Sequence, residues 1–187
     1  TDVQLDTPVL QRIRTRPDMN WLFMIIYQIE HELEIVAQLH VTTNQTIHFA
    51  GGRVLLPNAD IYGQSDTRAL SLRATPPVRY ALERARQAIR YTDLHRELVT
   101  MFPTATSEQV DQLLWQLWEN HFFLSNLRPP FAHEAPTRYV LDRLSTLQGV
   151  ESTTTILQSV LEEAEALDRA GAGGSVTLLR NLARHQE

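Results

Sequence analysis

The chain has 187 residues, of which 43% are hydrophobic, so it can bury a core of ordinary size. It contains no cysteine, and all 17 of its basic residues are arginine, which excludes disulfides, thiolate metal sites, cysteine nucleophiles and lysine chemistry. The net charge is −5, so a polyanionic partner would need a local basic patch rather than the overall charge.

The start of the chain carries no recognisable targeting signal. Residues 1–6 lack the basic start and apolar centre of a secretory signal, and the longest apolar run, residues 21–27, is far shorter than a membrane span. These features predict a cytoplasmic protein. The chain begins with Thr1 rather than methionine, so we expect either an excised piece of a longer protein or a stand-alone split protein.

The first third of the chain predicts a helix followed by strands. Asp18 can accept hydrogen bonds from the free N–H groups of a first helical turn, and apolar residues recur at near-helical spacing as far as Val36. A helix is therefore expected over residues 18–39. Gly51-Gly52 then separates two short β-prone runs, which predicts a hairpin whose turn uses the positive φ of glycine. Residues 69–73 alternate apolar and polar side chains, the pattern of a half-buried strand.

Three helices and a second apolar run follow this strand. Helix starts are indicated at Thr75, Thr92 and Thr106, the last with the capping-box partner Gln109. The apolar run over residues 122–127 would close the unit as a wing. The predicted fold class is therefore α+β and mostly helical: a winged helix-turn-helix with a small antiparallel β-sheet, flanked by long helices on both sides.

This reading divides the chain into three segments. We expect an N-terminal segment with a long helix at 1–45, the winged helix-turn-helix unit at 46–128 and a C-terminal helical segment at 129–187. The last segment carries helical patterns at 136–147 and 153–170. A glycine-rich hinge and a further helix at 176–183 follow them.

No catalytic motif, metal site or cofactor site is predicted. His31-Glu32 begins like a zinc-protease helix, but no second histidine follows four residues later. The seven histidines are scattered, and the glycines at 171–174 lack both the dinucleotide spacing and a preceding strand.

The arginines are unevenly distributed. Seven of the 17 lie between residues 68 and 96, where the acidic residues are only Glu83 and Asp93. One interpretation is a set of solvated helix faces. The other is a basic patch that attracts peptide carboxylates or RNA phosphates, and its candidate members are Arg79, Arg84, Arg86 and Arg90.

The third helix of the unit is acidic and aromatic. Residues 107–122 contain no Arg, and a helix that reads base edges in the DNA major groove needs such donors. An extended peptide fits better, because it could add to the strand at 69–73 and pack on the third helix. The predicted peptide-binding residues are Ala69, Leu70, Ser71, Leu72, Arg73, Leu113, Leu114, Leu117 and Trp118.

Two alternatives stay open at this point. One is a winged-helix transcriptional regulator that binds DNA. The other is a purely structural interface module, indicated if the C-terminal helices cover the face with Trp115 and Trp118.

The order of several short motifs resembles the N-terminal region of lantibiotic dehydratases. Arg16-Pro-Asp-Met-Asn-Trp21 precedes a long helix, and a hairpin forms around Gly51-Gly-Arg-Val54. Ala74-Thr-Pro-Pro-Val78, Leu113-Leu-x-x-Leu117 and the run from Phe122 to Pro130 follow in the same order as in that family. The resemblance covers nearly the whole chain.

The resemblance implies a role in dehydrating Ser and Thr of ribosomally made peptides. Members of the family carry a peptide-recognition winged helix, similar to the pyrroloquinoline-quinone peptide chaperone, that binds the leader segment of a precursor as an added strand. Their co-substrate is glutamyl-tRNA, and a second domain eliminates the transferred glutamate. Asp18 would line the glutamylation pocket, or would simply cap its helix. The family's Arg-rich motif and its elimination domain are absent here, so we expect no catalysis by this chain alone.

Overall fold

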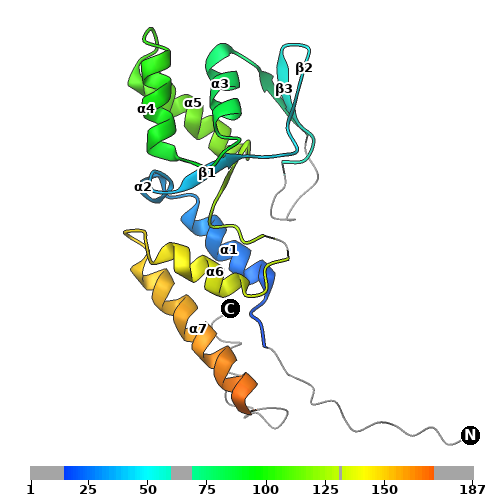
Figure 1. Cartoon of the computed structure of the whole chain (residues 1–187), viewed down its shortest axis with the longest axis vertical. Coiled ribbons are helices and arrows are strands. Elements are labelled where there is room, and N and C mark those ends of the chain that lie inside the picture. Colours follow the sequence, from blue (N-terminus) through cyan, green and yellow to red (C-terminus); the bar gives the residue numbers. More distant parts are fainter. Residues whose placement is uncertain (1–14, 60–68, 131, 171–187) are drawn as a thin grey trace, which may run out of the picture.

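The computed structural model describes residues 15–59, 69–130 and 132–170 (Figure 1). These residues form an α+β structure in which helices pack beside two small antiparallel sheets. In chain order its elements are α1 (Met19–Ile29), α2 (Leu33–Val36), β1 (His40–Thr43), β2 (His48–Ala50), β3 (Arg53–Leu56), β4 (Leu70–Arg73), α3 (Pro76–Arg84), β5 (Ile89–Arg90), α4 (Tyr91–Met101), α5 (Ser107–Glu119), β6 (Phe123–Ser125), α6 (Pro136–Leu144) and α7 (Glu151–Ala170).

The start of the first helix is as predicted, but its length is not. Asp18 accepts a hydrogen bond from the Asn20 backbone N–H at 2.6 Å, so it caps α1. The prediction of one helix over 18–39 is wrong, because α1 ends at Ile29 and the short α2 leads into β1. Tertiary contacts override the helical periodicity here: Glu30 is buried, and its carbonyl accepts the indole N–H of Trp118 at 2.8 Å.

Sheet A joins three distant parts of the chain in the order β5-β1-β6. The central strand β1 pairs antiparallel with both neighbours, for example Val41 with Ile89 and with Ser125. Its inner face is buried, since Val41 is 0% exposed, and its Thr43 hydroxyl donates to the Leu82 carbonyl at 2.6 Å. The strand β6 therefore pairs with β1 rather than with a neighbouring wing strand.

Sheet B is built from consecutive strands in the order β2-β3-β4. The predicted hairpin is present, with Gly51 and Gly52 at φ of 56° and 75° in its two-residue turn. The predicted strand at 69–73 is β4, and its residues alternate between half-buried and exposed side chains. Its buried pairing partners on β3 are Val54 and Leu56.

The helices α3, α4 and α5 pack beside the sheets around a single apolar core (Figure 1). The helix starts are close to those predicted, and Thr106 with Gln109 forms both hydrogen bonds of a capping box at the start of α5. Leu82, Leu94, Leu98 and Leu114 are all 0% exposed and form the centre of this core.

The C-terminal helices α6 and α7 lie next to α1, at the opposite end of the structure from the hairpin (Figure 1). They confirm the helical patterns predicted near 136–147 and 153–170. The predicted hinge at 171–174 and the helix at 176–183 lie outside the described residues. Within the described part of the chain, no helix combines the length and apolarity that crossing a membrane requires.

Candidate functional site

A groove runs between β4 and α5. It has an empty volume of about 840 Å³, including the space open to solvent. One wall is β4 and the other is one face of α5, and apolar side chains dominate the space between them. The lining residues are Leu70, Ser71, Leu72, Arg73, Thr75, Val78, Leu113, Gln116, Leu117, Asn120 and Phe122.

The strand wall of this groove has a free backbone edge. Among the described strands, β4 has β3 as its only neighbour. The Ala74 N–H donates to the Gly52 carbonyl at 2.9 Å, next to the cross-strand pair of Arg73 with Arg53. Residue pairs in an antiparallel ladder alternate between hydrogen-bonded and non-hydrogen-bonded. The N–H and C=O groups of Ser71 and the N–H of Arg73 therefore point away from β3, toward the free edge, whereas the Arg73 carbonyl accepts the Thr75 N–H at 2.9 Å.

The helix wall divides the predicted residues of α5 into two sets. Leu113 and Leu117 line the groove together with four of the predicted strand residues, from Leu70 to Arg73. Leu114 does not line the groove, and its side chain, 0% exposed, belongs to the core. Trp118 also points away from the groove, and its indole is 6% exposed beside the turn after α1.

Several groove residues were not predicted. Gln116 and Asn120 follow Leu113 at the i+3 and i+7 positions, so helical spacing alone places them on its face. Val78 and Phe122 also line the groove, although both are buried. Asn120 additionally donates to the Gln116 carbonyl at 2.8 Å, which fixes the last turn of α5.

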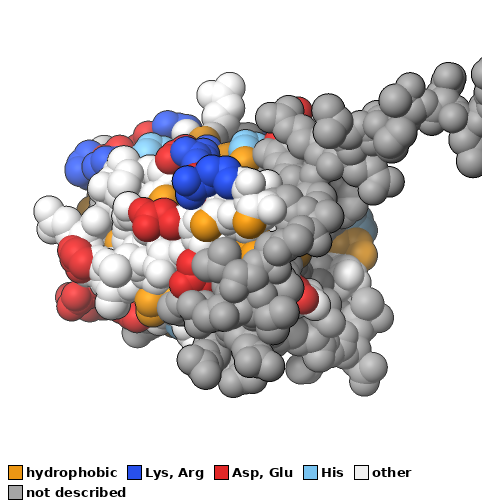
Figure 2. Space-filling view, turned by 90° about the horizontal axis from the view of Figure 1, so that it is seen from below, with side chains coloured by type: hydrophobic (Ala, Val, Ile, Leu, Met, Phe, Trp, Pro, Cys, Tyr) orange, Lys and Arg blue, Asp and Glu red, His pale blue; other side chains and the backbone are white. Residues whose placement is uncertain are grey.

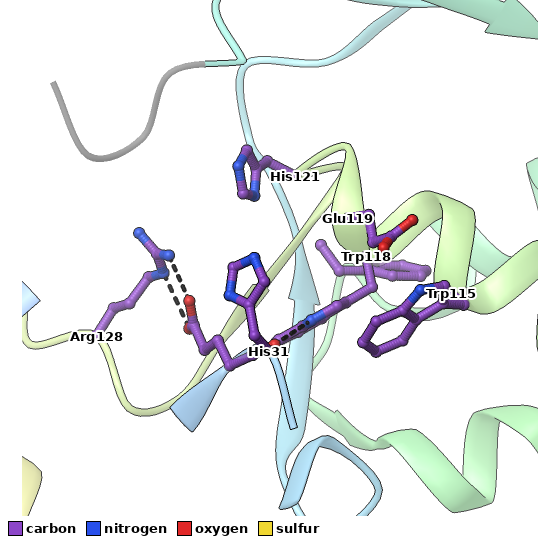
Figure 3. A pocket seen from close by; sticks show the side chains of 8 residues that line it. His31, Trp115, Trp118, Glu119, His121 and Arg128 are labelled. Atoms are coloured by element: carbon purple, nitrogen blue, oxygen red, sulfur yellow. Dashed lines mark hydrogen bonds and ion pairs between the residues drawn. The ribbon is translucent and has the colours of Figure 1, made fainter. Parts of the chain in front are cut away.

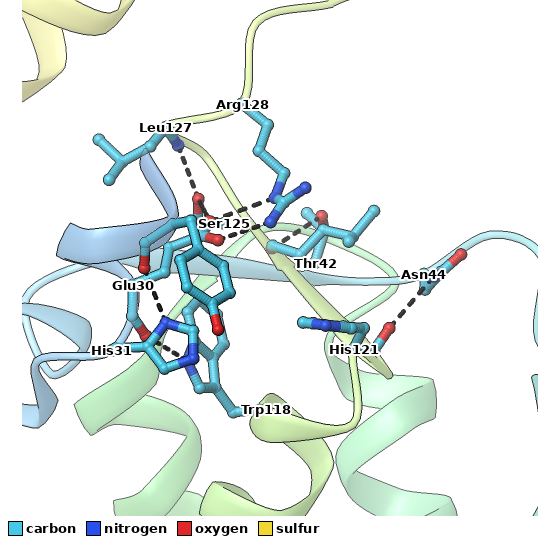
Figure 4. Close-up of polar contacts among 11 residues, drawn as sticks. Glu30, His31, Thr42, Asn44, Trp118, His121, Ser125, Leu127 and Arg128 are labelled. Carbon is cyan, nitrogen blue, oxygen red and sulfur yellow. Dashed lines mark hydrogen bonds and ion pairs between the residues drawn. The ribbon is translucent and has the colours of Figure 1, made fainter. Parts of the chain in front are cut away.

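A buried polar cluster ties the far face of α5 to α1 and β6 (Figure 4). The carboxylate of Glu30 accepts from both Nη2 and Nε of Arg128, at 2.6 and 3.2 Å, and from the Ser125 hydroxyl at 2.5 Å. The Ser125 hydroxyl also accepts from the Leu127 N–H at 3.1 Å. These contacts satisfy a carboxylate whose side chain is only 6% exposed.

The aromatic face of α5 is covered by this cluster and by α4. Trp118 stacks edge-on against Tyr91 with ring centroids 6.5 Å apart, and burial raises the pKa of the Tyr91 hydroxyl. A small pocket beside them is lined by Trp115, His31 and His121, among others (Figure 3). The residues that cover this face belong to the end of α1 and to α4. The structural-interface alternative would instead require cover by the C-terminal helices.

The predicted basic patch is partly neutralised within the fold. Arg84 donates two hydrogen bonds to Glu97, at 2.8 and 3.1 Å, and Arg79 pairs with Glu83 at 3.5 Å. Arg86 and Arg90 are exposed and form no ion pair within the described ranges. The sequence count overstated the local charge, because Glu97 lies just beyond the window that was counted.

Asp18 lies far from the groove, at the start of α1 on the side of the C-terminal helices (Figure 1). A separate cleft lies between α6, α7 and the residues before α1, and Arg16, Arg138, Glu165 and Asp168 are among its lining residues. Acidic and basic groups are intermixed there: Arg138 pairs with Glu165, and Asp168 accepts from the Thr15 N–H. Figure 2 shows this mixture of basic and acidic side chains on the described part of the lower face.

The fold is similar to that of one part of a dehydratase of known structure. The tRNA-dependent lantibiotic dehydratase MibB from Microbispora sp. 107891 superposes with a TM-score of 0.79 and 24% sequence identity. The superposition covers 92% of this chain and 18% of that chain.

The sequence comparisons name the family. A family model for the N terminus of lantibiotic dehydratases matches residues 2–187, so this chain belongs to that family. The chain is also 26% identical over 161 residues to the subtilin biosynthesis protein SpaB of Bacillus subtilis. That match covers 86% of this chain and 15% of SpaB, so the chain spans less than a fifth of the length of either relative.

Proposed function

We propose that this chain is the part of a lantibiotic dehydratase that binds the leader segment of a precursor peptide. The leader adds as a strand to the free edge of β4 and packs its side chains into the groove against α5. The observation that carries this proposal is the groove itself, which has on one wall a strand edge that is unpaired among the described strands and on the other an apolar helix face. We propose that sheet B with α3, α4 and α5 is a winged helix-turn-helix unit, although β6 pairs with β1 rather than closing this unit as a wing.

Strand addition also accounts for the chemistry of the two walls. The outward N–H and C=O groups of Ser71 and the outward N–H of Arg73 would form the main-chain hydrogen bonds that give affinity. Side chains of an added strand alternate between its two faces, so every second leader residue would face Leu113 and Leu117. We therefore expect leaders that carry apolar residues at two alternating positions.

The whole enzyme would supply the chemistry. We propose that it dehydrates Ser and Thr in a cytoplasmic pathway, with glutamyl-tRNA as co-substrate, and that elimination takes place in a part of the enzyme outside this chain. The tRNA-dependent activity named for MibB supports this assignment for the longer protein. No cofactor or metal is invoked. Asp18 remains a candidate to line the glutamylation pocket, in addition to its cap on α1, and Arg86 and Arg90 remain candidates to contact RNA.

DNA reading is the weaker alternative for the same fold. The exposed face of α5 carries Glu108, Asp111 and Glu119, whose charges would repel a duplex. Steeply salt-dependent binding to a duplex oligonucleotide would support a regulator instead.

The test is a calorimetric titration of the chain with a synthetic peptide of the cognate leader sequence. We expect binding tighter than millimolar, with a peptide of the same composition in scrambled order as the control. A second titration uses Leu113→Asp, which places a charge in the groove on a side chain that is only half-buried. Equal affinity of Leu113→Asp and the wild-type chain, or no binding by a folded wild-type sample, would refute the proposal.

A further inference from the structure

The free edge of β4 is partly occupied by a side chain of its own sheet. Arg53 lies on β3, directly opposite Arg73. Its guanidinium does not stay over β3 but reaches diagonally to Ser71. The Nε–H donates to the Ser71 hydroxyl at 2.6 Å, and Nη2 donates to the Ser71 carbonyl oxygen at 2.9 Å.

The acceptor of the second hydrogen bond is a free-edge group. The strand register places the Ser71 carbonyl on the side of β4 that faces away from β3, so an added strand would donate an N–H to it. Arg53 therefore crosses over β4 and sits where the incoming strand needs to bind. Both side chains are exposed, so this contact is not required to fill the core.

The positive charge of Arg73 explains why the Arg53 side chain takes this diagonal path. Like charges directly opposite each other on antiparallel strands repel, and Arg73 is the direct partner of Arg53. The repulsion moves the guanidinium away from Arg73 and toward the neutral Ser71.

We propose that Arg53 is a guard residue on the peptide-binding edge, an inference that rests on the proposed peptide-binding function of β4. In the free protein the guanidinium blocks addition of an arbitrary strand, including the β4 edge of a second copy. Natural sheets protect exposed edges with charged side chains in a comparable way. A leader peptide binds only when its own contacts in the groove compensate for the two hydrogen bonds that Arg53 loses.

The test compares Arg53→Ala and Arg53→Lys with the wild-type chain, and Arg96→Ala serves as a matched control. Arg96 is an exposed arginine on α4 whose side chain pairs with Asp93, so its loss changes the charge equally but leaves β4 untouched. Arg53→Lys keeps the positive charge but loses the planar guanidinium, so it separates the effect of the two hydrogen bonds from that of charge repulsion. Thermal melts monitored by circular dichroism establish that each variant is folded.

Two readouts are measured. The first is the affinity for the synthetic leader peptide, which we expect to rise about tenfold in Arg53→Ala, since two hydrogen bonds of ordinary net strength no longer oppose binding. The second is the weight-average mass of the peptide-free chain in sedimentation experiments, which we expect to rise with concentration in Arg53→Ala more than in the wild type. Arg53→Lys should resemble Arg53→Ala, and Arg96→Ala should resemble the wild type.

The outcomes separate the two proposals. Suppose that the wild type binds the leader, and that Arg53→Ala binds it equally or more weakly and shows no new self-association. This result overturns the guard role, while peptide binding stands. If Arg53→Ala self-associates but neither it nor the wild type binds the leader, the result supports the guard role and overturns peptide binding. Wild-type behaviour of Arg53→Lys in both readouts would show that charge alone protects the edge, which also overturns the hydrogen-bonded guard.

Discussion

Sheet A and sheet B have the same number of strands and the same antiparallel pairing, but they differ in origin and burial. In sheet A the central strand β1 is paired on both sides, with strands that lie 46 or more residues away from it in the chain. Sheet B is a local meander whose last strand keeps a free edge among the described elements. This difference in origin and burial indicates that sheet A holds the fold together, whereas the edge of sheet B is available to a partner.

The same division runs through α5. One face anchors sheet A through Trp118 and the Glu30 cluster, and the other forms a wall of the groove beside sheet B. A single helix thus connects the stable part of the molecule to the part that we propose binds peptide. Mutations on its two faces should therefore have separable effects.

The largest effect is expected at the Glu30 cluster. Glu30→Ala would leave Arg128 buried without its carboxylate, and breaking a buried ion pair in this way costs about 3–5 kcal/mol. Urea unfolding measures the change in the free energy of unfolding. The control is Arg138→Ala, whose pair with Glu165 is about half exposed and should contribute at most about 1 kcal/mol. Equal losses in the two variants would contradict a special role for the cluster.

The second-largest effect is expected from substitutions at two neighbouring leucines of α5, one in the core and one in the groove. Leu114→Ala creates a cavity in the core and should lower the free energy of unfolding by about 2–5 kcal/mol. Leu113→Ala should cost less stability, because the side chain is half-buried, and should weaken leader binding instead. Denaturation and peptide titration of both variants check this. Weaker leader binding by a folded Leu114→Ala sample than by Leu113→Ala would reverse the assignment of the two faces.

The third effect concerns prolines in β4. Arg73→Pro removes an N–H that points to the free edge, so leader affinity should fall at least about tenfold relative to Arg73→Ala, while the β3–β4 ladder survives. Leu72→Pro removes an N–H that the register directs at β3, so it should destabilise sheet B itself. Calorimetric titration and thermal melts distinguish the two. The pairing argument fails if Leu72→Pro melts like the wild type.

The smallest effect is a pH dependence at the start of α5. The Glu108 backbone N–H and the Thr106 hydroxyl hold the pKa of the Glu108 carboxyl below its usual range. A lowered pKa in the folded state contributes stability above the unfolded-state pKa, and this contribution is lost as the pH falls through the folded-state pKa. Glu108→Gln should therefore be slightly less stable than the wild type near neutral pH and equal to it in acid, as urea midpoints across that range would reveal. The matched control, Glu119→Gln at the other end of the helix, should show no such loss at neutral pH.

Local signals in the sequence predicted most of the fold. Glycines at a hairpin turn, a capping box at Thr106 and alternation over residues 69–73 each depend on neighbouring residues, and all three are present. The error at residues 30–43 has a different source. The periodicity around Ile29 is helical, but Glu30 turns inward to contact Arg128, which lies 98 residues later. No local pattern indicates such a contact.

The groove residues could also be predicted in part, because some of them follow local sequence patterns. The strand residues and Leu113 were identified because strand alternation and helical spacing reveal exposed faces. Leu114 and Trp118 were grouped with them because a helix that is apolar over more than half its circumference does not indicate which part faces the core. The guard contact of Arg53 depends on the register between β3 and β4, and a hairpin pattern does not fix how a third strand aligns.

The separation of the strands of sheet A has a consequence for how the chain folds during synthesis. The strands of sheet B are complete once residue 73 has been made, whereas sheet A cannot close until β6 ends at Ser125. During that interval β4 would be exposed on a nascent chain, where unpaired edges favour aggregation. Arg53 precedes β4 in the chain, so the guanidinium that we propose protects the edge is available as soon as the edge forms.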